Sequence, residues 1–139
     1  MTLSNDVYWN RMVPELSVTD FSVSLNFYTQ ILGFSIMVRR RDPDFAYINL
    51  GEAQLMLEQY SSDAWNTAEL IKPFGRGVNF QIDVDDIDVI YRRVMRNNVT
   101  LYRELKDSHY DIGNHIACQR EFLLQAPDGY LLRFSQYIE

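Results

Sequence analysis

The chain has 139 residues, a length that suits one compact domain or two very small fused halves. Thirteen basic against 19 acidic side chains give a formal net charge of −6, and this balance argues against nucleic acid, whose phosphates attract a basic surface. Aromatic residues make up 14% of the chain, which is compatible with an aromatic core and with a pocket for a flat organic ligand. No apolar run approaches the roughly 18 residues of a membrane-spanning helix, so we expect no membrane partner.

The first half of the chain predicts a strand, a helix and three further strands. Residues 11–19 alternate in the manner of a strand. Asp20 then offers a helix N-cap, and Gly33 stands where a residue in the left-handed conformation would end the helix. Three strand-like runs follow, at residues 34–40, 45–50 and 53–60.

The second half predicts the same order of elements after a polar connector at residues 61–75. A strand is expected at 78–84, and Asp85-Asp86 opens a helix that Asn97-Asn98 ends. Residues 106–119 are predicted as a long polar loop. The remaining strands are expected at 99–105, 121–125 and 130–137.

An internal repeat relates the two halves. Val18-Thr19-Asp20-Phe21 and Val84-Asp85-Asp86-Ile87 each end a strand and cap a helix with Asp. Repeated units of this kind stack to bury a face that neither buries alone. The sequence therefore predicts an α+β fold in which two βαβββ modules form curved mixed sheets around a cleft. We expect one domain over 1–139, with module one at about 11–60, the connector at 61–75 and module two at about 76–137.

Strand alternation assigns one face of each sheet to the core and the other to the cleft. The consistently apolar set, expected beneath the helices, is Leu16, Val18, Leu55, Leu57, Phe80, Ile82, Phe122, Leu124, Leu132 and Phe134. The opposite set, expected to face the cleft, is Val13, Glu15, Ser17, Gln54, Met56, Glu58, Asn79, Gln81, Asp83, Glu121, Leu123, Arg133 and Ser135. This second set carries four acids against one arginine, which suits a positively charged ligand.

Two alternatives remain open for these residues. Some could face plain solvent, because the sheets are open. Arg133 could pair with Glu15, Glu58 or Glu121, and a paired arginine would be structural rather than ligand-binding.

Trp65 in the connector could be a stacking platform at the rim of the cleft or could fill a dimer interface. The opposite wall could come from Tyr102, Tyr110 and His115.

Three segments, in order and at half-chain spacing, resemble the glyoxalase/bleomycin-resistance/dioxygenase (vicinal oxygen chelate) superfamily. Residues 14–34, from Pro14-Glu15-Leu16 to Leu32-Gly33-Phe34, resemble its first module, and 77–88 resemble the start of its second. Residues 120–134, with Pro127-Asp128-Gly129, resemble its closing hairpin and are most similar there to bleomycin-resistance proteins. The resemblance covers about residues 12–136.

The resemblance also implies where a metal would bind. Enzymatic members of the superfamily hold a divalent ion on the cleft face, and the corresponding places in this sequence hold Val13, Asn79 and Arg133. Valine has no donor atom, asparagine is a poor ligand for a transition metal, and arginine is a permanent cation. Glu58 is the remaining carboxylate near such a place, and both histidines fall in the 106–119 segment. We therefore expect no metal and no other cofactor.

The resemblance and the residues together favour a small-molecule-binding protein over an enzyme. Members of the bleomycin-resistance type sequester a cationic, aromatic-bearing antibiotic in clefts formed by a dimer, so a homodimer is expected, with no catalytic residues. The single cysteine, Cys118, fits a reducing cytoplasm. The alternative is a glyoxalase-like lyase or isomerase, or a dioxygenase, with an atypical metal site. The candidate ligand-binding residues are Glu15, Met56, Glu58, Trp65, Asn79, Gln81, Tyr102, His115 and Arg133.

Overall fold

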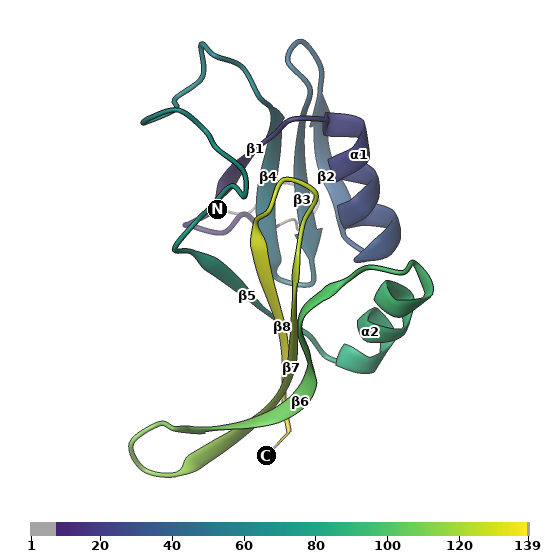
Figure 1. Ribbon diagram of the computed structural model, residues 1–139, viewed down its shortest axis with the longest axis vertical. Coiled ribbons are helices and arrows are strands. Elements are labelled where there is room, and N and C mark those ends of the chain that lie inside the picture. Colours follow the sequence, from purple (N-terminus) through teal and green to yellow (C-terminus); the bar gives the residue numbers. More distant parts are fainter. Residues whose placement is uncertain (1–7, 139) are drawn as a thin grey trace.

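The structure is a computed structural model that describes residues 8–138, and it consists of two four-stranded sheets, each with a helix on one face (Figure 1). The first half contains β1 (Glu15–Val18), α1 (Phe21–Asn26), the short π-helix η1 (Phe27–Ile31), β2 (Ser35–Arg40), β3 (Phe45–Leu50) and β4 (Ala53–Gln59). The second half contains β5 (Asn79–Asp83), α2 (Ile87–Arg96), β6 (Leu101–Asp111), β7 (Ile116–Gln125) and β8 (Leu131–Tyr137).

Both sheets have the same topology. The strand order is β1-β4-β3-β2 in the first sheet and β5-β8-β7-β6 in the second. In each sheet the first strand of the half pairs in parallel with the last, and the other pairs are antiparallel. The α+β prediction of two βαβββ modules with mixed sheets is thus confirmed.

The two helices begin at the predicted caps. The Asp20 carboxylate accepts a hydrogen bond from the backbone N–H of Val23, and the Asp86 carboxylate accepts one from Asp88. Gly33 has a φ of +94°, and a Cβ there would collide with the guanidinium of Arg93. The backbone conformation therefore favours glycine at this position, and any other residue would also have to displace the end of the Arg93 side chain.

The core lies between each sheet and its helix, where the predicted apolar set faces. Nine of the ten residues of that set are buried, and the tenth, Phe80, is half-buried against the same cluster. Because strand side chains alternate, burial of this face leaves the opposite face of each sheet available for a site.

The prediction of a polar loop at 106–119 is wrong, because β6 and β7 form a long hairpin through this segment. Figure 1 shows the hairpin extending away from the rest of the molecule. Its outer part is a two-stranded ribbon: β7 meets β8 only from the pair Gln119 and Tyr137 onward. A ribbon exposed on both faces needs no apolar alternation, so the pattern that identifies half-buried strands is missing.

The first strand is shorter than predicted, since β1 begins at Glu15 rather than at residue 11. Pro14 has no N–H to donate to the ladder, although its carbonyl accepts from the backbone N–H of Met56 at 2.9 Å. Val13, which lies at one expected metal-ligand place, thus falls before the strand.

The β7–β8 turn ties the second half to the first. Asp128 in this turn is buried and accepts from the backbone N–H of Thr19 at 3.0 Å and from its hydroxyl at 2.5 Å. The Tyr130 hydroxyl donates to the Ser17 carbonyl at 2.8 Å. In Figure 1 this turn, in yellow, lies beside the first sheet. Within residues 8–138 no helix is long and apolar enough to cross a bilayer.

Candidate functional site

The face of the first sheet opposite α1 carries two rows of side chains set by strand register. In one row Met56 of β4 lies between Glu15 of β1 and Tyr47 of β3. In the next row Ser17, Glu58, Phe45 and Arg40 follow one another across all four strands. Two carboxylates therefore occupy adjacent rows at one side of the sheet, and two aromatic rings occupy the same rows beside them.

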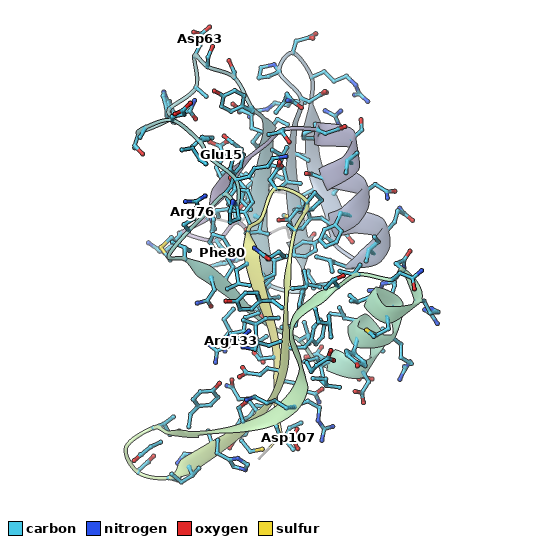
Figure 2. All side chains as sticks on the ribbon, viewed as in Figure 1. Glu15, Asp63, Arg76, Phe80, Asp107 and Arg133 are labelled. Carbon is cyan, nitrogen blue, oxygen red and sulfur yellow. The ribbon has the colours of Figure 1, made fainter. Side chains whose placement is uncertain are left out.

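A cavity of about 500 Å³ opens over the acidic side of these rows. Figure 2 shows Glu15 on the first half, beneath the connector that carries Asp63. Connector residues line the cavity from the other side, among them Trp65, a residue that is 96% exposed. The lining residues are Glu15, Ser17, Arg40, Glu58, Ala64, Trp65 and Asn66. An exposed indole beside two carboxylates offers a stacking surface next to negative charge.

The two carboxylates of the cavity influence one another. Partial burial raises the pKa of Glu15, the negative charge of Glu58 raises it further, and the positive charge of Arg40 opposes both effects. Bringing a ligand cation to this position would relieve the repulsion between the carboxylates. The electrostatics of the cavity therefore favour a positively charged occupant.

The segment before β1 covers the other side of the same sheet face. The Trp9 ring packs edge-on against Tyr47, with 4.6 Å between ring centroids and an interplanar angle of 84°. Gln54 Oε1 accepts from the backbone N–H of Asn10 at 2.9 Å and from the Tyr47 hydroxyl at 2.6 Å. These contacts bury Gln54, which was expected to face the cleft, and they extend the aromatic surface next to Met56.

A second polar cluster lies on the corresponding face of the second sheet. Arg133 donates from Nε to Oε2 of Glu121 at 2.9 Å and from Nη2 to the Tyr110 hydroxyl at 3.0 Å. The Tyr110 hydroxyl in turn donates to Glu121. Burial alone would raise the pKa of Glu121, but the hydrogen bonds from Tyr110 and Arg133 outweigh it and lower that pKa below its usual range. Figure 2 shows Arg133 on the second half, lower in the view than Glu15.

The candidate residues thus fall into separate groups. Glu15, Met56, Glu58 and Trp65 lie together on or over the first sheet. On the second sheet Arg133 of β8 pairs in register with Gln81 of β5. Asn79 lies two residues before Gln81 on β5. The two remaining candidates, Tyr102 and His115, lie in neither group.

Tyr102 and His115 both belong to the β6–β7 hairpin, at opposite ends of it. Tyr102 lines a separate hollow of about 220 Å³ together with Val78 and Leu131. His115 is exposed at the hairpin turn, and its Nδ1 lies 2.8 Å from Oδ1 of Asn114. Within the described chain neither side chain approaches the cavity on the first sheet.

Sequence reasoning missed Arg40, Ala64 and Asn66 as cavity residues. The sequence pattern did not show which face of the sheet Arg40 lies on. A register shift between Ile36 and Val38 reverses the alternation of side chains from which faces are assigned. Arg40 and Phe45 belong to adjacent strands, so hairpin pairing across the 41–44 turn is the signal that could have placed Arg40 on the cleft face. No comparable signal existed for the connector.

The donor set does not fit a divalent metal ion. Within residues 8–138 no three His, Cys, Asp or Glu side chains cluster closely enough to hold one. At the place where the superfamily resemblance implies a ligand stands Arg133, a permanent cation already bonded to Glu121. A cation in that place would repel a metal ion. Without a metal, this face can bind a ligand through its carboxylates, amides and aromatic rings.

Two βαβββ modules, with their helices on one face and an open polar face on the other, define a two-module α+β protein of the vicinal-oxygen-chelate architecture. The model of the Glyoxalase/Bleomycin resistance protein/Dioxygenase superfamily matches residues 10–134. The chain therefore belongs to this superfamily.

Curated relatives share the length of the chain. A bleomycin resistance protein from Geobacillus stearothermophilus and one from Staphylococcus aureus are each 26% identical to it over 138 residues, which cover 93% of this chain and 98% of theirs. The likeness therefore extends over both halves.

Solved structures show the same fold at lower identity. A glyoxalase/bleomycin resistance protein/dioxygenase from Alicyclobacillus acidocaldarius has a TM-score of 0.64 and 23% identity, covering 100% of this chain and 96% of its own. TioX from Micromonospora sp. has a TM-score of 0.68 and 18% identity, covering 94% of this chain and 100% of its own. Both matches support the two-module fold.

Proposed function

We propose that this protein binds and sequesters a cationic, aromatic small molecule without changing it chemically. The observation that carries the proposal is the cavity that Glu15, Glu58 and Trp65 line together. Carboxylates attract a cation, and an indole face stabilises one further when it stacks on it. The names of the curated relatives support a ligand of the bleomycin kind, and on this basis we propose a role in antibiotic resistance.

The polar groups of the second sheet extend the proposed binding surface. Asn79 and Gln81 are exposed on β5, and they can donate and accept hydrogen bonds with neutral parts of a large ligand. Arg133 serves there mainly to hold Glu121 and Tyr110 in place. Ligand charge is therefore recognised on the first sheet, and ligand shape on both.

We also propose that the chain works as a homodimer. Both sheets are open, and open sheets leave unpaired edges that proteins usually cover. A second copy placed over the polar faces would enclose the cavity, which in one chain is bounded only by the first sheet and the connector. Size-exclusion chromatography with light scattering should give the mass of two chains at micromolar concentration, and the mass of one chain would contradict the proposal.

The binding proposal is tested by calorimetry with three probes of similar size. N-methylacridinium is a planar cation, acridone is planar and neutral, and 2-anthroate is planar and anionic. We expect binding in the order cation, neutral, anion, with bleomycin included as the ligand that the relatives' names indicate.

A pair of matched variants locates the effect. Glu58→Gln should weaken binding of the cation mainly at low salt, because the attraction is partly electrostatic. Glu104→Gln makes the same chemical change at an exposed position of β6 and should leave binding unchanged. Equal affinity for all three probes would contradict the proposal.

A further inference from the structure

The cavity proposed for a cationic ligand already contains a cation. Arg40 lines it together with Glu15 and Glu58, and its guanidinium carbon lies 4.1 Å from the centroid of the Phe45 ring. Phe45 separates Arg40 from Glu58 in the strand register. Phe45 itself lines an adjoining hollow of about 310 Å³, and Arg40 and Glu58 line both that hollow and the cavity.

Arg40 is held there weakly. Its side chain is exposed, and among the ion pairs of residues 8–138 none includes it. The neighbouring Arg39 shows the contrast: its Nη2 lies 2.8 Å from Oδ1 of Asp44, and its guanidinium stacks over Phe21 on the other face of the sheet. An exposed cation–π contact is a small contribution, so Arg40 can leave Phe45 at little cost.

We infer that Arg40 is an internal competitor that occupies the position of the ligand's cation until the ligand displaces it. A planar cation can replace both of its interactions, because the Phe45 ring lies next to Glu58 in the strand register and Glu58 also lines the cavity. A small ammonium ion replaces the charge but not the planar stacking. Arg40 therefore lowers the affinity of every cation that must displace it, and a planar cation recovers more of the lost interactions than a simple amine does, an inference that rests on the proposed function of the same cavity.

The test compares the affinity of N-methylacridinium for the wild type and for Arg40→Gln by calorimetry. The Arg40 guanidinium competes with the probe for the Phe45 ring and carries the same charge as the probe. Its removal should therefore tighten binding about tenfold. Arg40→Lys keeps the charge without the planar group and should give an intermediate affinity. Arg92→Gln, which removes a positive charge from the exposed side of α2, controls for the change in net charge and should bind like the wild type.

A second cation gives a second comparison. Benzyltrimethylammonium should gain by about the same factor as N-methylacridinium from Arg40→Gln, because a competitor on the protein reduces equally the affinity of every ligand that must displace it. A ligand-free measurement checks the position of Arg40: in a carboxyl carbon NMR titration, Arg40→Gln should raise the pKa of Glu15 further, since a neighbouring positive charge is lost.

The outcomes separate the two proposals. Tighter binding by Arg40→Gln, with the affinity of Arg92→Gln equal to that of the wild type, supports the role of Arg40 as an internal competitor. Binding by the wild type with equal or weaker binding by Arg40→Gln overturns the competitor and leaves the proposed function standing. An absence of binding by both proteins overturns the proposed function itself. An unchanged pKa of Glu15 in Arg40→Gln overturns the placement of Arg40 beside it.

Discussion

Arg133 and Glu121 form an ion pair across the neighbouring strands β8 and β7, with 2.9 Å between Nε and Oε2. The Glu121 side chain is 7% exposed and that of Arg133 is 23% exposed, so the pair is largely shielded from water. Each charge compensates the burial of the other. This pairing is the structural alternative expected for Arg133, and it favours a role in holding Glu121 over a direct contact with ligand.

The first prediction concerns the stability of this pair. Arg133→Met should lower the free energy of unfolding by about 1–3 kcal/mol, because it leaves the Glu121 carboxylate buried with one partner fewer. The double variant Arg133→Met/Glu121→Gln should recover part of the loss. Urea denaturation measures both, with Arg92→Met as the exposed control. A single variant as stable as the control would show that the pair contributes nothing.

The second prediction is the pH dependence of stability that Glu121 confers. Its pKa in the folded protein is lowered, so the folded state holds the proton less tightly than the unfolded state does. The resulting stability is present above the unfolded value of about 4.3 and is lost as the pH falls through the folded pKa. In Arg133→Met this loss between neutral and acidic pH should be smaller. Identical pH profiles for the two proteins would contradict the assignment.

The third prediction concerns Trp65. Trp65→Ala should weaken binding of N-methylacridinium by about 1–3 kcal/mol, the range for losing a stacked aromatic partner. Trp9→Phe retains an aromatic ring against Tyr47 and leaves Trp65 as the sole tryptophan. In that background the probe should quench tryptophan fluorescence. Unquenched emission, or full affinity in Trp65→Ala, would move the ligand away from the connector.

The fourth prediction follows from the raised pKa of Glu15. As the pH falls, Glu15 should take up a proton at a higher pH than an ordinary glutamate, and affinity for the cation should begin to fall there. The sign for stability is the opposite of that for Glu121: a raised carboxyl pKa makes the ionised form unfavourable to folding above it. Glu15→Gln should thus bind the cation more weakly at neutral pH but be slightly more stable. A simultaneous loss of both properties would contradict this account.

The fifth prediction concerns metal ions. Addition of zinc, nickel, manganese or iron should shift the melting temperature by no more than about a degree, because Arg133 occupies a place where a donor would be needed. Elemental analysis of the purified protein should find no stoichiometric metal. A large shift with one ion would instead favour the glyoxalase-like or dioxygenase alternative.

Much of the fold could be predicted because local chemistry and strand alternation agree. Asp20 and Asp86 cap their helices as predicted, and Gly33 has the positive φ expected of the residue that ends the first helix. The same alternation places Glu15 and Glu58 on one face, and the structure brings them into one cavity. These features depend on short-range periodicity, which a single sequence records directly.

What the sequence did not reveal depends on longer-range geometry. The β6–β7 hairpin was missed because its two exposed faces carry no apolar period, and with it the contact of Tyr110 with Glu121. Arg40 was missed because of the bulge before Val38. The position of Trp9 against Tyr47 follows from where the chain before β1 crosses the sheet, which composition does not encode.

The outer part of the β6–β7 hairpin carries a further consequence for amide hydrogen exchange. Near Phe122 and Leu124 the strand β7 is buried and bonded on both sides, whereas near Ile116 it has β6 alone, and the Ile116 side chain is 56% exposed. Protection should therefore decline along a single strand, from slow exchange at its inner end to fast exchange at the tip, since local opening costs least where few contacts are buried. A second copy that covers the ribbon would flatten this gradient, so the exchange profile of β7 alone reports whether the hairpin is held by another chain.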